Sequence, residues 1–501
     1  MNLSPPVVFF VGSGLNSKEI FPVSTFTLLF FYDTFIDRTQ RKIMAKPKHT
    51  IPLRAGDRLE LEIETQSSSG DGISRHEGYT LFVPGGLVGD RVWAEVTKIT
   101  PRFGVMRILE RRVDSPYRIT PTCSVFEQCG GCKLQDLEYK KQMEFKVGVV
   151  ADALKHIAGI DPPAIRPVPA EQIYRYRNRG SFPVQKIRGA IRIGFFKQGS
   201  HDVVDSDRCD ILPDRINETK EWVRELLIKH GVSIYDERRH RGFLRELVIR
   251  YSENSGEILL GLITTEGTFP ETFLAEVKSS DALNQLHIRG IVQNINPQKT
   301  NVIFGSDTHV LWGESSLNET LGDLKFRLSL TSFFQVHPRQ TIQLYETLRQ
   351  WAASSTGRIL DAYCGAGAIS LWLGKSGLQV AGIEELPQAV EDARENARAN
   401  KIESCIFLQG TVEEQIKKFT GKREVETLIL NPPRKGCSEK VLQAVSKIAP
   451  KKIIYVSCNP ATLARDLSQL RKYRIDDLAV FDLFPQTQHV ETAVLLHPTA
   501  S

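Results

Sequence analysis

A cysteine stands at the end of a hydrophobic stretch that we expect to be a buried strand. Residues 453–456 are Ile-Ile-Tyr-Val, and the chain continues as Ser457-Cys458-Asn459-Pro460, a sequence typical of a turn. In open α/β sheets, ligands bind beyond the carboxyl ends of the strands. Cysteine is also a common core residue, so the position alone does not establish a reactive thiol. Cys458 is therefore a candidate nucleophile whose neighbours must decide the question.

Three further cysteines are spaced closely enough to hold one metal centre. Cys123, Cys129 and Cys132 form a C-x5-C-x2-C pattern, in which Gly130-Gly131 lets the backbone curl around the centre. A closed site needs a fourth ligand, and the next cysteine is Cys209, far away in the sequence. Four thiolates suit either zinc or an iron–sulfur cluster, although zinc ribbons usually repeat C-x2-C. The alternative is a set of free thiols without a metal.

A glycine-rich turn between two expected strands could bind a nucleoside cofactor. Residues 358–363 are expected to form a strand, and the turn with Gly365 and Gly367 allows close backbone approach to a ligand before a helix begins. The next strand ends at Glu384, whose carboxylate could accept hydrogen bonds from both ribose hydroxyls. A dinucleotide fold would carry a third glycine, whereas Ala368 follows here. The pattern is similar to S-adenosylmethionine (SAM) binding.

Two long signatures make the chain similar to a known enzyme family. Asn-Pro-Pro-Arg-Lys-Gly at 431–436, followed by Ile-Ile-Tyr-x-Ser-Cys-Asn-x-x-Thr at 453–462, resembles the first signature of the RNA uracil-C5 methyltransferases. Phe-Asp-Leu-Phe-Pro-Gln-Thr-Gln-His-Val-Glu at 481–491 resembles their second signature. The Cys-x5-Cys-Gly-Gly-Cys run followed by Leu-Gln resembles the site of a 4Fe-4S cluster in these enzymes. The resemblance covers about residues 50–500.

This resemblance implies covalent catalysis on a uracil base. Uracil C5 is a poor nucleophile, but a thiolate that adds to C6 gives the ring carbanion character at C5. That carbon takes the methyl group of SAM, and a base removes the C5 proton so that the thiolate can leave. Cys458 is expected to be the nucleophile and Glu491 the base. His489 is a weaker candidate that could orient the base or the substrate.

Together with the glycine turn, the resemblance assigns residues to the two cofactors. The SAM site is expected to comprise Gln335, Tyr363, Gly365, Gly367, Glu384, Thr411 and Asn431. The 4Fe-4S cluster is expected to bind Cys123, Cys129, Cys132 and Cys209, and to be structural, because this methyl transfer needs no electron. Ala368 stands where many relatives carry a polar Asn, and Asn431 where many carry Asp, so one cofactor hydrogen bond and one charge are expected to be absent.

Composition fits a globular chain with an anionic partner. The chain has 501 residues, of which 41% are hydrophobic and 25% charged, enough for two to four domains. Its net charge of +6 favours an anionic partner such as nucleic acid. Eight cysteines are too few for a disulfide scaffold, which indicates a reducing, cytoplasmic location. Neither a membrane nor an obligate protein partner is expected.

The expected fold class is multidomain α+β, and its first domain is an OB-like β-barrel at residues 50–115. Short alternating strands, such as residues 59–64, are separated by glycine turns. The turn motifs of this stretch resemble those of the TRAM domain, an RNA-binding barrel attached to RNA-modifying enzymes. They are Gly56-Asp57, Asp71-Gly72, Val83-Pro84-Gly85 and Gly89-Asp90. The basic residues of this domain that favour phosphate contact are Arg102, Arg107, Arg111 and Arg112.

Two further domains are expected to follow the barrel. Residues 116–330 should form a central α/β domain that carries the cysteine cluster and an RNA-binding surface. Within it, Tyr174-Arg-Tyr-Arg-Asn-Arg-Gly suits stacking on bases with arginines on phosphates, and equally suits an ordinary exposed edge strand. Residues 331–501 should form a Rossmann-like SAM-dependent methyltransferase domain with a parallel sheet. A uracil within a helix would have to be unstacked or flipped to reach this domain.

Residues 1–43 do not fit the rest of the chain. Their apolar run is shorter than the roughly 20 residues that span a bilayer, and most of their basic residues follow it rather than precede it, unlike a signal peptide. Met44 begins Met-Ala-Lys-Pro-Lys, a plausible start. We expect residues 1–43 to be a mis-called extension or disordered.

Other functions remain open at this stage. An exocyclic-amine methylase also uses Asn-Pro-Pro, but usually before an aromatic residue, whereas Arg434 follows here. An RNA-binding ribosome assembly factor that has lost catalysis would explain Ala368 and Asn431. The barrel and the cysteine cluster resemble the 23S ribosomal RNA members of the family more than the transfer RNA members, so ribosomal RNA is the expected substrate and transfer RNA the alternative.

Overall fold

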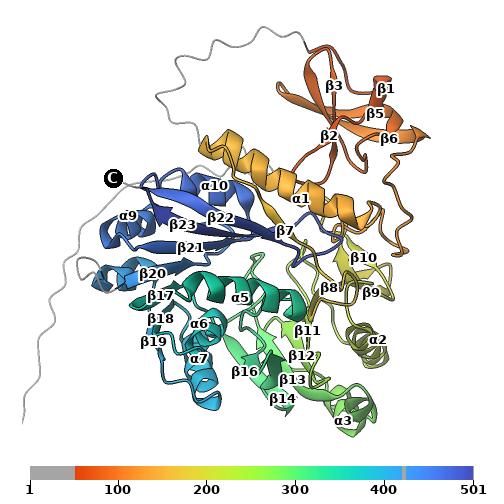
Figure 1. Ribbon diagram of the computed structural model, residues 1–501. Coiled ribbons are helices and arrows are strands. Elements are labelled where there is room, and N and C mark those ends of the chain that lie inside the picture. Colours follow the sequence, from red (N-terminus) through yellow and green to blue (C-terminus); the bar gives the residue numbers. More distant parts are fainter. Residues whose placement is uncertain (1–50, 420–424, 500–501) are drawn as a thin grey trace, which may run out of the picture. The chain divides into compact units, whose positions relative to one another are not determined.

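The computed structural model describes residues 51–419 and 425–499, so the expectation for residues 1–43 lies outside the described residues. The described residues form a small barrel, a central sheet, a hairpin and a C-terminal sheet (Figure 1). None of the helices in the described ranges is long and apolar enough to cross a membrane.

The first domain is a sheet that closes on itself. Its strands are β1 (Arg58–Glu62), β2 (Thr65–Gln66), β3 (Gly72–His76), β4 (Tyr79–Val83), β5 (Arg91–Ile99) and β6 (Phe103–Val113), in the order β1-β5-β6-β4-β3-β2. Only two residues separate β1 from β2, so the two ends of this order are halves of one broken strand. Alternate residues such as Leu61, Leu81 and Val92 point inward and form the core of the barrel.

The central domain contains a mostly antiparallel sheet in the order β10-β9-β8-β11-β12-β13-β14. These strands are β8 (Arg179–Ile187), β9 (Ala190–Phe196), β10 (Val203–Asp205), β11 (Leu244–Tyr251), β12 (Ile258–Thr264), β13 (Ile288–Ile295) and β14 (Asp307–Gly313). Helices α2 (Asp214–Lys229), α3 (Glu271–Ser279) and α4 (Ala282–Gln285) pack on one face, where Phe182 and Val184 point. Part of the other face, including Val248 and Leu259, belongs to a core shared with the C-terminal domain.

The C-terminal sheet has the order β19-β18-β17-β20-β21-β23-β22-β7. Its strands are β7 (Arg166–Val168), β17 (Arg358–Ala362), β18 (Val380–Glu384), β19 (Cys405–Gln409), β20 (Val425–Leu430), β21 (Lys452–Ser457), β22 (Tyr473–Phe481) and β23 (Glu491–Pro498). Strands β17 to β21 are parallel, as alternating strands and helices predict. The expectation of a parallel sheet is wrong for β23, which runs antiparallel between β21 and β22.

Helices cover both faces of this sheet (Figure 1). Apolar residues of α5 (Pro338–Ala352), α6 (Ala368–Gly374) and α7 (Pro387–Ala399) join one core cluster, with the hairpin β15 (Ser316–Leu321) and β16 (Leu324–Ser329) beside them. The other face is covered by α1 (Tyr139–Ala153) with the π-helical turn η2 (Leu154–Ala158), α8 (Val412–Gln415) with the 3₁₀ turn η3 (Ile416–Phe419), α9 (Glu439–Ile448) and α10 (Pro460–Leu467). Helix α1 and strand β7 precede the central sheet in the chain. The C-terminal sheet and its helices are therefore built from two separate stretches of sequence.

Candidate active site

Several of the expected site residues lie along one edge of the C-terminal sheet. Thr411, Glu384, Asn431 and Cys458 stand at or just beyond the carboxyl ends of β19, β18, β20 and β21, which are near neighbours in the sheet. The carboxyl ends of parallel strands meet at the same edge, so the strand order alone brings these side chains to one region. Gln335 comes from the loop between β16 and α5 instead, where it is buried and its backbone oxygen accepts a hydrogen bond from Asn178.

Cys458 lies between the end of a strand and the start of a helix. The residues of β21 are buried, whereas Cys458, which follows directly, is partly exposed and not in a disulfide. Asn459 caps α10, because its side-chain oxygen accepts a hydrogen bond from the Ala461 amide at 3.1 Å. The sharp change from strand to helix leaves the thiol at the sheet edge, as the sequence predicts.

Glu491 is the neighbour of Cys458 on the adjacent strand. The antiparallel register pairs Ser457 with Thr492, so the next step along the two chains brings Cys458 opposite Glu491. Glu491 is only 3% exposed. Burial raises its pKa to about 8, although the positive charge of Arg434 acts in the opposite direction. A buried carboxylate with this pKa is a stronger base than an exposed one.

Arg434 supplies a positive charge to this pair, a role that the sequence interpretation did not assign. Burial and the charge of Glu491 raise the pKa of the Cys458 thiol, whereas the charge of Arg434 and a hydrogen bond from its side chain lower it. The backbone oxygen of Arg434 accepts hydrogen bonds from Asn459 Nδ2 at 3.0 Å and Thr462 Oγ1 at 3.2 Å. These hydrogen bonds join the two halves of the first signature. The arginine of Asn-Pro-Pro-Arg was the feature of the sequence that could have indicated a positive charge beside Cys458.

His489 lies beside cations and is half-buried. Burial, followed by the positive charges of Arg434, Arg177 and Lys146, lowers the pKa of His489 to about 4. The imidazole is therefore neutral at neutral pH and a weaker base than Glu491. Its ring meets the Phe484 ring edge to face, with 5.8 Å between the centroids.

Helix α1 anchors the loop that leads to Glu491. Lys146 Nζ and Asp482 Oδ1 are 2.5 Å apart in an ion pair whose two side chains are fully buried. Gln142 and Gln486 hydrogen-bond reciprocally, from Gln142 Nε2 to Gln486 Oε1 at 3.0 Å and from the Gln486 amide to Gln142 Oε1 at 3.1 Å. Such contacts fix the loop between Asp482 and Glu491 on a rigid element.

The glycine turn after β17 has the geometry of a cofactor cradle. Tyr363, Gly365 and Gly367 all have positive φ, of 71°, 55° and 84°. A Cβ on Gly367 would approach side-chain atoms of neighbouring residues at 3.0–3.1 Å, so glycine is needed there. The Glu384 carboxylate accepts hydrogen bonds from the amides of Gly365 at 3.0 Å and Leu386 at 2.9 Å. This carboxylate therefore stands at the opening of the turn.

One buried atom of the residue that precedes this turn lacks a partner among the described residues. Asp361 Oδ2 accepts a hydrogen bond from Ser370 Oγ at 2.6 Å, but Asp361 Oδ1 is buried and has no hydrogen bond within that part of the chain. Burial raises the pKa of Asp361 to about 7. A free acceptor, the glycine turn and Glu384 together fit a cofactor that carries an amino group and a ribose, as SAM does.

The four expected cluster ligands lie near one another, although far apart in sequence. Burial raises the pKa of the Cys132 thiol well above its usual value, and the charges of Cys209, Cys129 and Cys123 raise it further. All four thiols are free. Within the described residues, however, no three His, Cys, Asp or Glu side chains already converge at metal-ligand spacing. The donor set fits a four-thiolate centre, and the side chains would have to turn inward to bind it.

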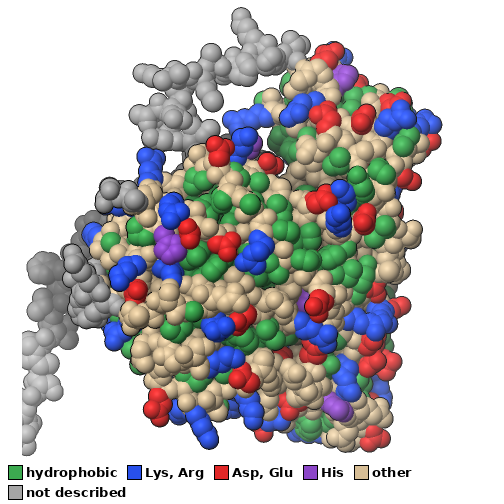
Figure 2. Space-filling view, viewed as in Figure 1, with side chains coloured by type: hydrophobic (Ala, Val, Ile, Leu, Met, Phe, Trp, Pro, Cys, Tyr) green, Lys and Arg blue, Asp and Glu red, His purple; other side chains and the backbone are tan. Residues whose placement is uncertain are grey.

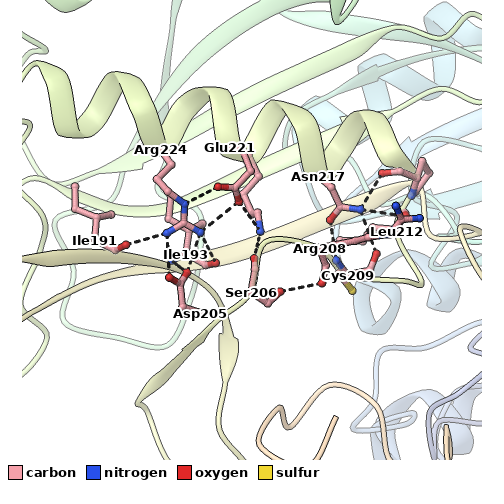
Figure 3. Close-up of polar contacts among 12 residues, drawn as sticks. Ile191, Ile193, Asp205, Ser206, Arg208, Cys209, Leu212, Asn217, Glu221 and Arg224 are labelled. Carbon is pink, nitrogen blue, oxygen red and sulfur yellow. Dashed lines mark hydrogen bonds and ion pairs between the residues drawn. The ribbon is translucent and has the colours of Figure 1, made fainter. Parts of the chain in front are cut away.

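Helix α2 positions the most distant of these ligands (Figure 3). Asn217 Oδ1 accepts a hydrogen bond from the Cys209 amide at 2.9 Å, and Asn217 Nδ2 donates one to the Cys209 carbonyl at 3.2 Å. Two turns further along the helix, Arg224 donates to the Ile191 carbonyl at 2.8 Å and pairs with Asp205 at 2.8 Å. These contacts hold the loop that carries Cys209 against the central sheet.

Two alternatives were open for residues 174–180, and the one in which aromatic residues stack on bases is wrong for Tyr176. Its side chain is 3% exposed, stacks on His337 and donates a hydrogen bond from its hydroxyl to the Pro485 carbonyl at 3.0 Å. It therefore packs the second signature rather than contacting RNA. On the face drawn in Figure 2, basic and acidic side chains of the described residues alternate, so charge alone does not mark an RNA path there.

The chain is similar to known proteins along most of its length. Residues 138–499 match the family described as tRNA (uracil-5-)-methyltransferase, and residues 52–105 match the TRAM domain. A protein of Halalkalibacterium halodurans called an uncharacterized RNA methyltransferase is 38% identical over 454 residues, which cover 90% of this chain and 99% of the relative. One of Listeria innocua with the same description is 38% identical over 449 residues, 89% of this chain and 98% of the relative.

A solved structure is also similar along most of the chain. It is the tRNA (uracil-54, C5)-methyltransferase of Pyrococcus abyssi in complex with S-adenosyl-L-homocysteine. The TM-score is 0.71 and the sequence identity 28%, with 87% of this chain and 100% of that chain covered.

Proposed function

Since the chain belongs to the RNA uracil-C5 methyltransferase family, and is a SAM-dependent RNA (uracil-5-)-methyltransferase, we propose that it acts through a covalent bond between Cys458 and its target base. The observation that carries this proposal is the position of Cys458 opposite a buried Glu491 across two neighbouring strands. The proposed nucleophile and the proposed base thus come from different signatures of the sequence.

The proposed reaction divides the work between three side chains. Cys458 Sγ forms a bond to uracil C6, and the positive charge of Arg434 stabilises the thiolate from which this bond forms. SAM, when bound, supplies the electrophilic methyl group that C5 accepts. Glu491 then takes the C5 proton, the electrons of that C–H bond restore the C5–C6 double bond, and the thiolate leaves C6. The raised pKa of Glu491 suits it to removing a proton from carbon.

The proposed SAM site lies at the glycine turn. Gly365 and Gly367 allow close backbone approach, and Glu384 would accept hydrogen bonds from the ribose hydroxyls. Asp361 Oδ1 is a further acceptor that has no hydrogen-bond partner in the described ranges. Thr411 and Asn431 follow neighbouring strands at the same sheet edge, and Gln335 and Tyr363 complete the proposed set. Ala368 starts α6 with no polar group, so one hydrogen bond to the cofactor would be absent.

We also propose a structural 4Fe-4S cluster on Cys123, Cys129, Cys132 and Cys209. The closeness of these thiols, whose charges raise one another's pKa, supports it. Iron and sulfide content after anaerobic purification would test it, with Cys209→Ser expected to lose both. Full iron content in Cys209→Ser would reject Cys209 as a ligand.

Ribosomal RNA is the proposed substrate, with transfer RNA as the alternative. The barrel and the cysteine cluster favour ribosomal RNA by analogy within the family, whereas the similar Pyrococcus abyssi structure is of a transfer RNA enzyme. Methyl transfer from labelled SAM should be measured with unmodified large-subunit ribosomal RNA and with unmodified transfer RNA. Preference for transfer RNA would overturn the ribosomal assignment without affecting the chemistry.

The decisive experiment replaces uracil by 5-fluorouracil in the RNA. Fluorine cannot leave C5 as a proton does, so the wild type should stall as a covalent protein–RNA adduct. The adduct should be lost in Cys458→Ala and retained in Cys405→Ala, a matched cysteine buried in β19. Methylation without an adduct would reject Cys458 as nucleophile and favour an amine methylase. Neither methylation nor adduct on either RNA would favour a protein that only binds RNA.

A further inference from the structure

A large cavity lies in the central domain, away from the catalytic edge. Its volume is about 1060 Å³, and none of the proposed catalytic or SAM residues lines it. Ser181, Pro183 and Gln185 of β8 line it, whereas Phe182 between them points to the core under α2 and α3. The cavity therefore occupies the side of the sheet that these helices leave open.

Aromatic rings occur at two places in the lining of this cavity. Phe196, at the end of β9, is 40% exposed, and its ring centroid lies 5.2 Å from that of His201. Elsewhere in the lining, the Arg245 guanidinium lies over the Tyr235 ring, 4.9 Å from its centroid. Arg245 is held in place because it donates to the carbonyls of Asn296 at 2.6 Å and Gln298 at 2.8 Å. Flat groups fixed in this way provide surfaces on which a base can stack.

The free charges of the lining are positive. Three of its four carboxylates are already engaged: Asp202 pairs with Arg238 at 3.3 Å, Glu237 lies 3.0 Å from His201, and Asp236 accepts from backbone amides. Lys186 and Arg192, by contrast, have no side-chain partner in the described part of the chain. Unpaired cations beside exposed aromatic rings are a combination that suits nucleotides.

The remaining carboxylate of the lining is Glu246. Burial raises its pKa to about 7, while the charges of Arg179 and Arg245 lower it. No hydrogen bond to its side chain occurs within the described residues. A carboxyl group near its midpoint of ionisation can both donate and accept, so it can pair with the edge of a base.

Strand β8 connects this cavity to the catalytic site. Arg177 lies just before β8, and its positive charge lowers the pKa of both His489 and Arg179. The charge of Arg179 in turn lowers the pKa of Glu246. At about 3.3 Å per residue, Ser181 lies about 13 Å along the chain from Arg177, so one nucleic acid strand could contact both places.

We propose that this cavity binds an unstacked nucleotide of the same RNA that carries the target uridine. Its base would stack on Phe196 or Tyr235, Glu246 would pair with its edge, and Arg192 and Lys186 would contact phosphates. The proposal rests on the RNA substrate and adds a second base-binding site that would help to select the RNA.

The test measures binding of a fluorescent single-stranded RNA of about ten nucleotides to Phe196→Leu, Arg192→Ala and Lys278→Ala. Lys278 is an exposed cation on α3, outside the cavity, and serves as the matched control. Phe196→Leu should bind at least about fivefold more weakly. Arg192→Ala should lower the salt slope by about 0.7, the contribution of one phosphate contact, whereas Lys278→Ala should change neither quantity.

A second measurement concerns the choice of base. The mononucleotides AMP, GMP, CMP and UMP should compete with the RNA to different extents, and Glu246→Gln, which keeps the shape, should change their order. Cavity variants that behave like Lys278→Ala, or an unchanged order of competition, would overturn the proposal. The outcome is distinct from the 5-fluorouracil test, because an adduct can form with an unused cavity, and RNA can bind the cavity in an enzyme that forms no adduct.

Discussion

Replacing Glu491 by Gln should make the stability of the protein less dependent on pH. A pKa raised from 4.5 to about 8 means that the folded state keeps a proton that the unfolded state releases. The free energy of unfolding therefore falls as pH rises between these values, by about 1.4 kcal/mol per pH unit in the middle of the window. Below about pH 4 both states are protonated and the effect disappears.

The expected size follows from integrating this slope. Between pH 5 and pH 8 the wild type should lose roughly 3 kcal/mol relative to Glu491→Gln, which has no proton to release. For a domain of roughly 150–250 residues, this free energy corresponds to a change of about 6–12 °C in the difference between the two melting temperatures. The variant should be the more stable protein at pH 8, and similar to the wild type at low pH.

The assay is thermal unfolding of both proteins at pH 5 and pH 8, and the quantity of interest is the difference between them. Burial also raises the pKa of Glu246, Glu319 and Asp361 to about 7, so the wild type alone is expected to lose stability for other reasons. These groups are present in both proteins and cancel in the difference. An equal difference at both pH values would show that Glu491 has an ordinary pKa, and would refute the argument that burial makes it a strong base.

Three further predictions concern the same region. Single-turnover methyl transfer should become faster as pH rises to about 8, because Glu491 accepts a proton only when ionised; a rate independent of pH between 6 and 9 would contradict this. Arg434→Ala should raise the pKa of Cys458 and slow its alkylation by iodoacetamide several-fold at pH 8, and unchanged alkylation would rule out the contact. Gly436→Ala should cost about 1–3 kcal/mol in denaturant unfolding, because its φ is 75° and a Cβ would lie 2.5 Å from an arginine nitrogen. Gly189→Ala, with a φ of 90° but no atom within 4 Å, should cost less, and equal losses would show that the close contact is unimportant.

The catalytic edge of the sheet could be predicted from sequence for a simple reason. Alternating strands and helices impose a parallel sheet, and parallel strands end at one edge. Glu384 and Cys458 are therefore expected at the same edge once their strands are recognised, without knowledge of any contact. The glycine turn could also be predicted, because a tight turn with positive φ favours glycine over other residue types.

Other features depend on contacts that no local pattern contains. The three residues of β7 have no recognisable periodicity, and their partner β22 lies far along the chain. Tyr176 alternates with arginines as a base-stacking residue would, but a pattern of residue types does not state which side is covered. The burial that sets the pKa of Glu491 also depends on β23 running antiparallel between two strands, a direction that its own sequence does not specify.

The buried ion pair between Lys146 and Asp482 has a consequence for synthesis on the ribosome. The two residues are 336 positions apart in the sequence. At roughly 5–20 residues per second, Lys146 leaves the ribosome about 20–70 s before its partner. During this interval α1 has an apolar face, with Met143 and Val150, and a cation that can enter a core only when paired. Helix α1 therefore cannot complete its packing on the C-terminal sheet until almost the whole chain has been made. The nascent protein should depend during this time on chaperones that bind exposed apolar side chains.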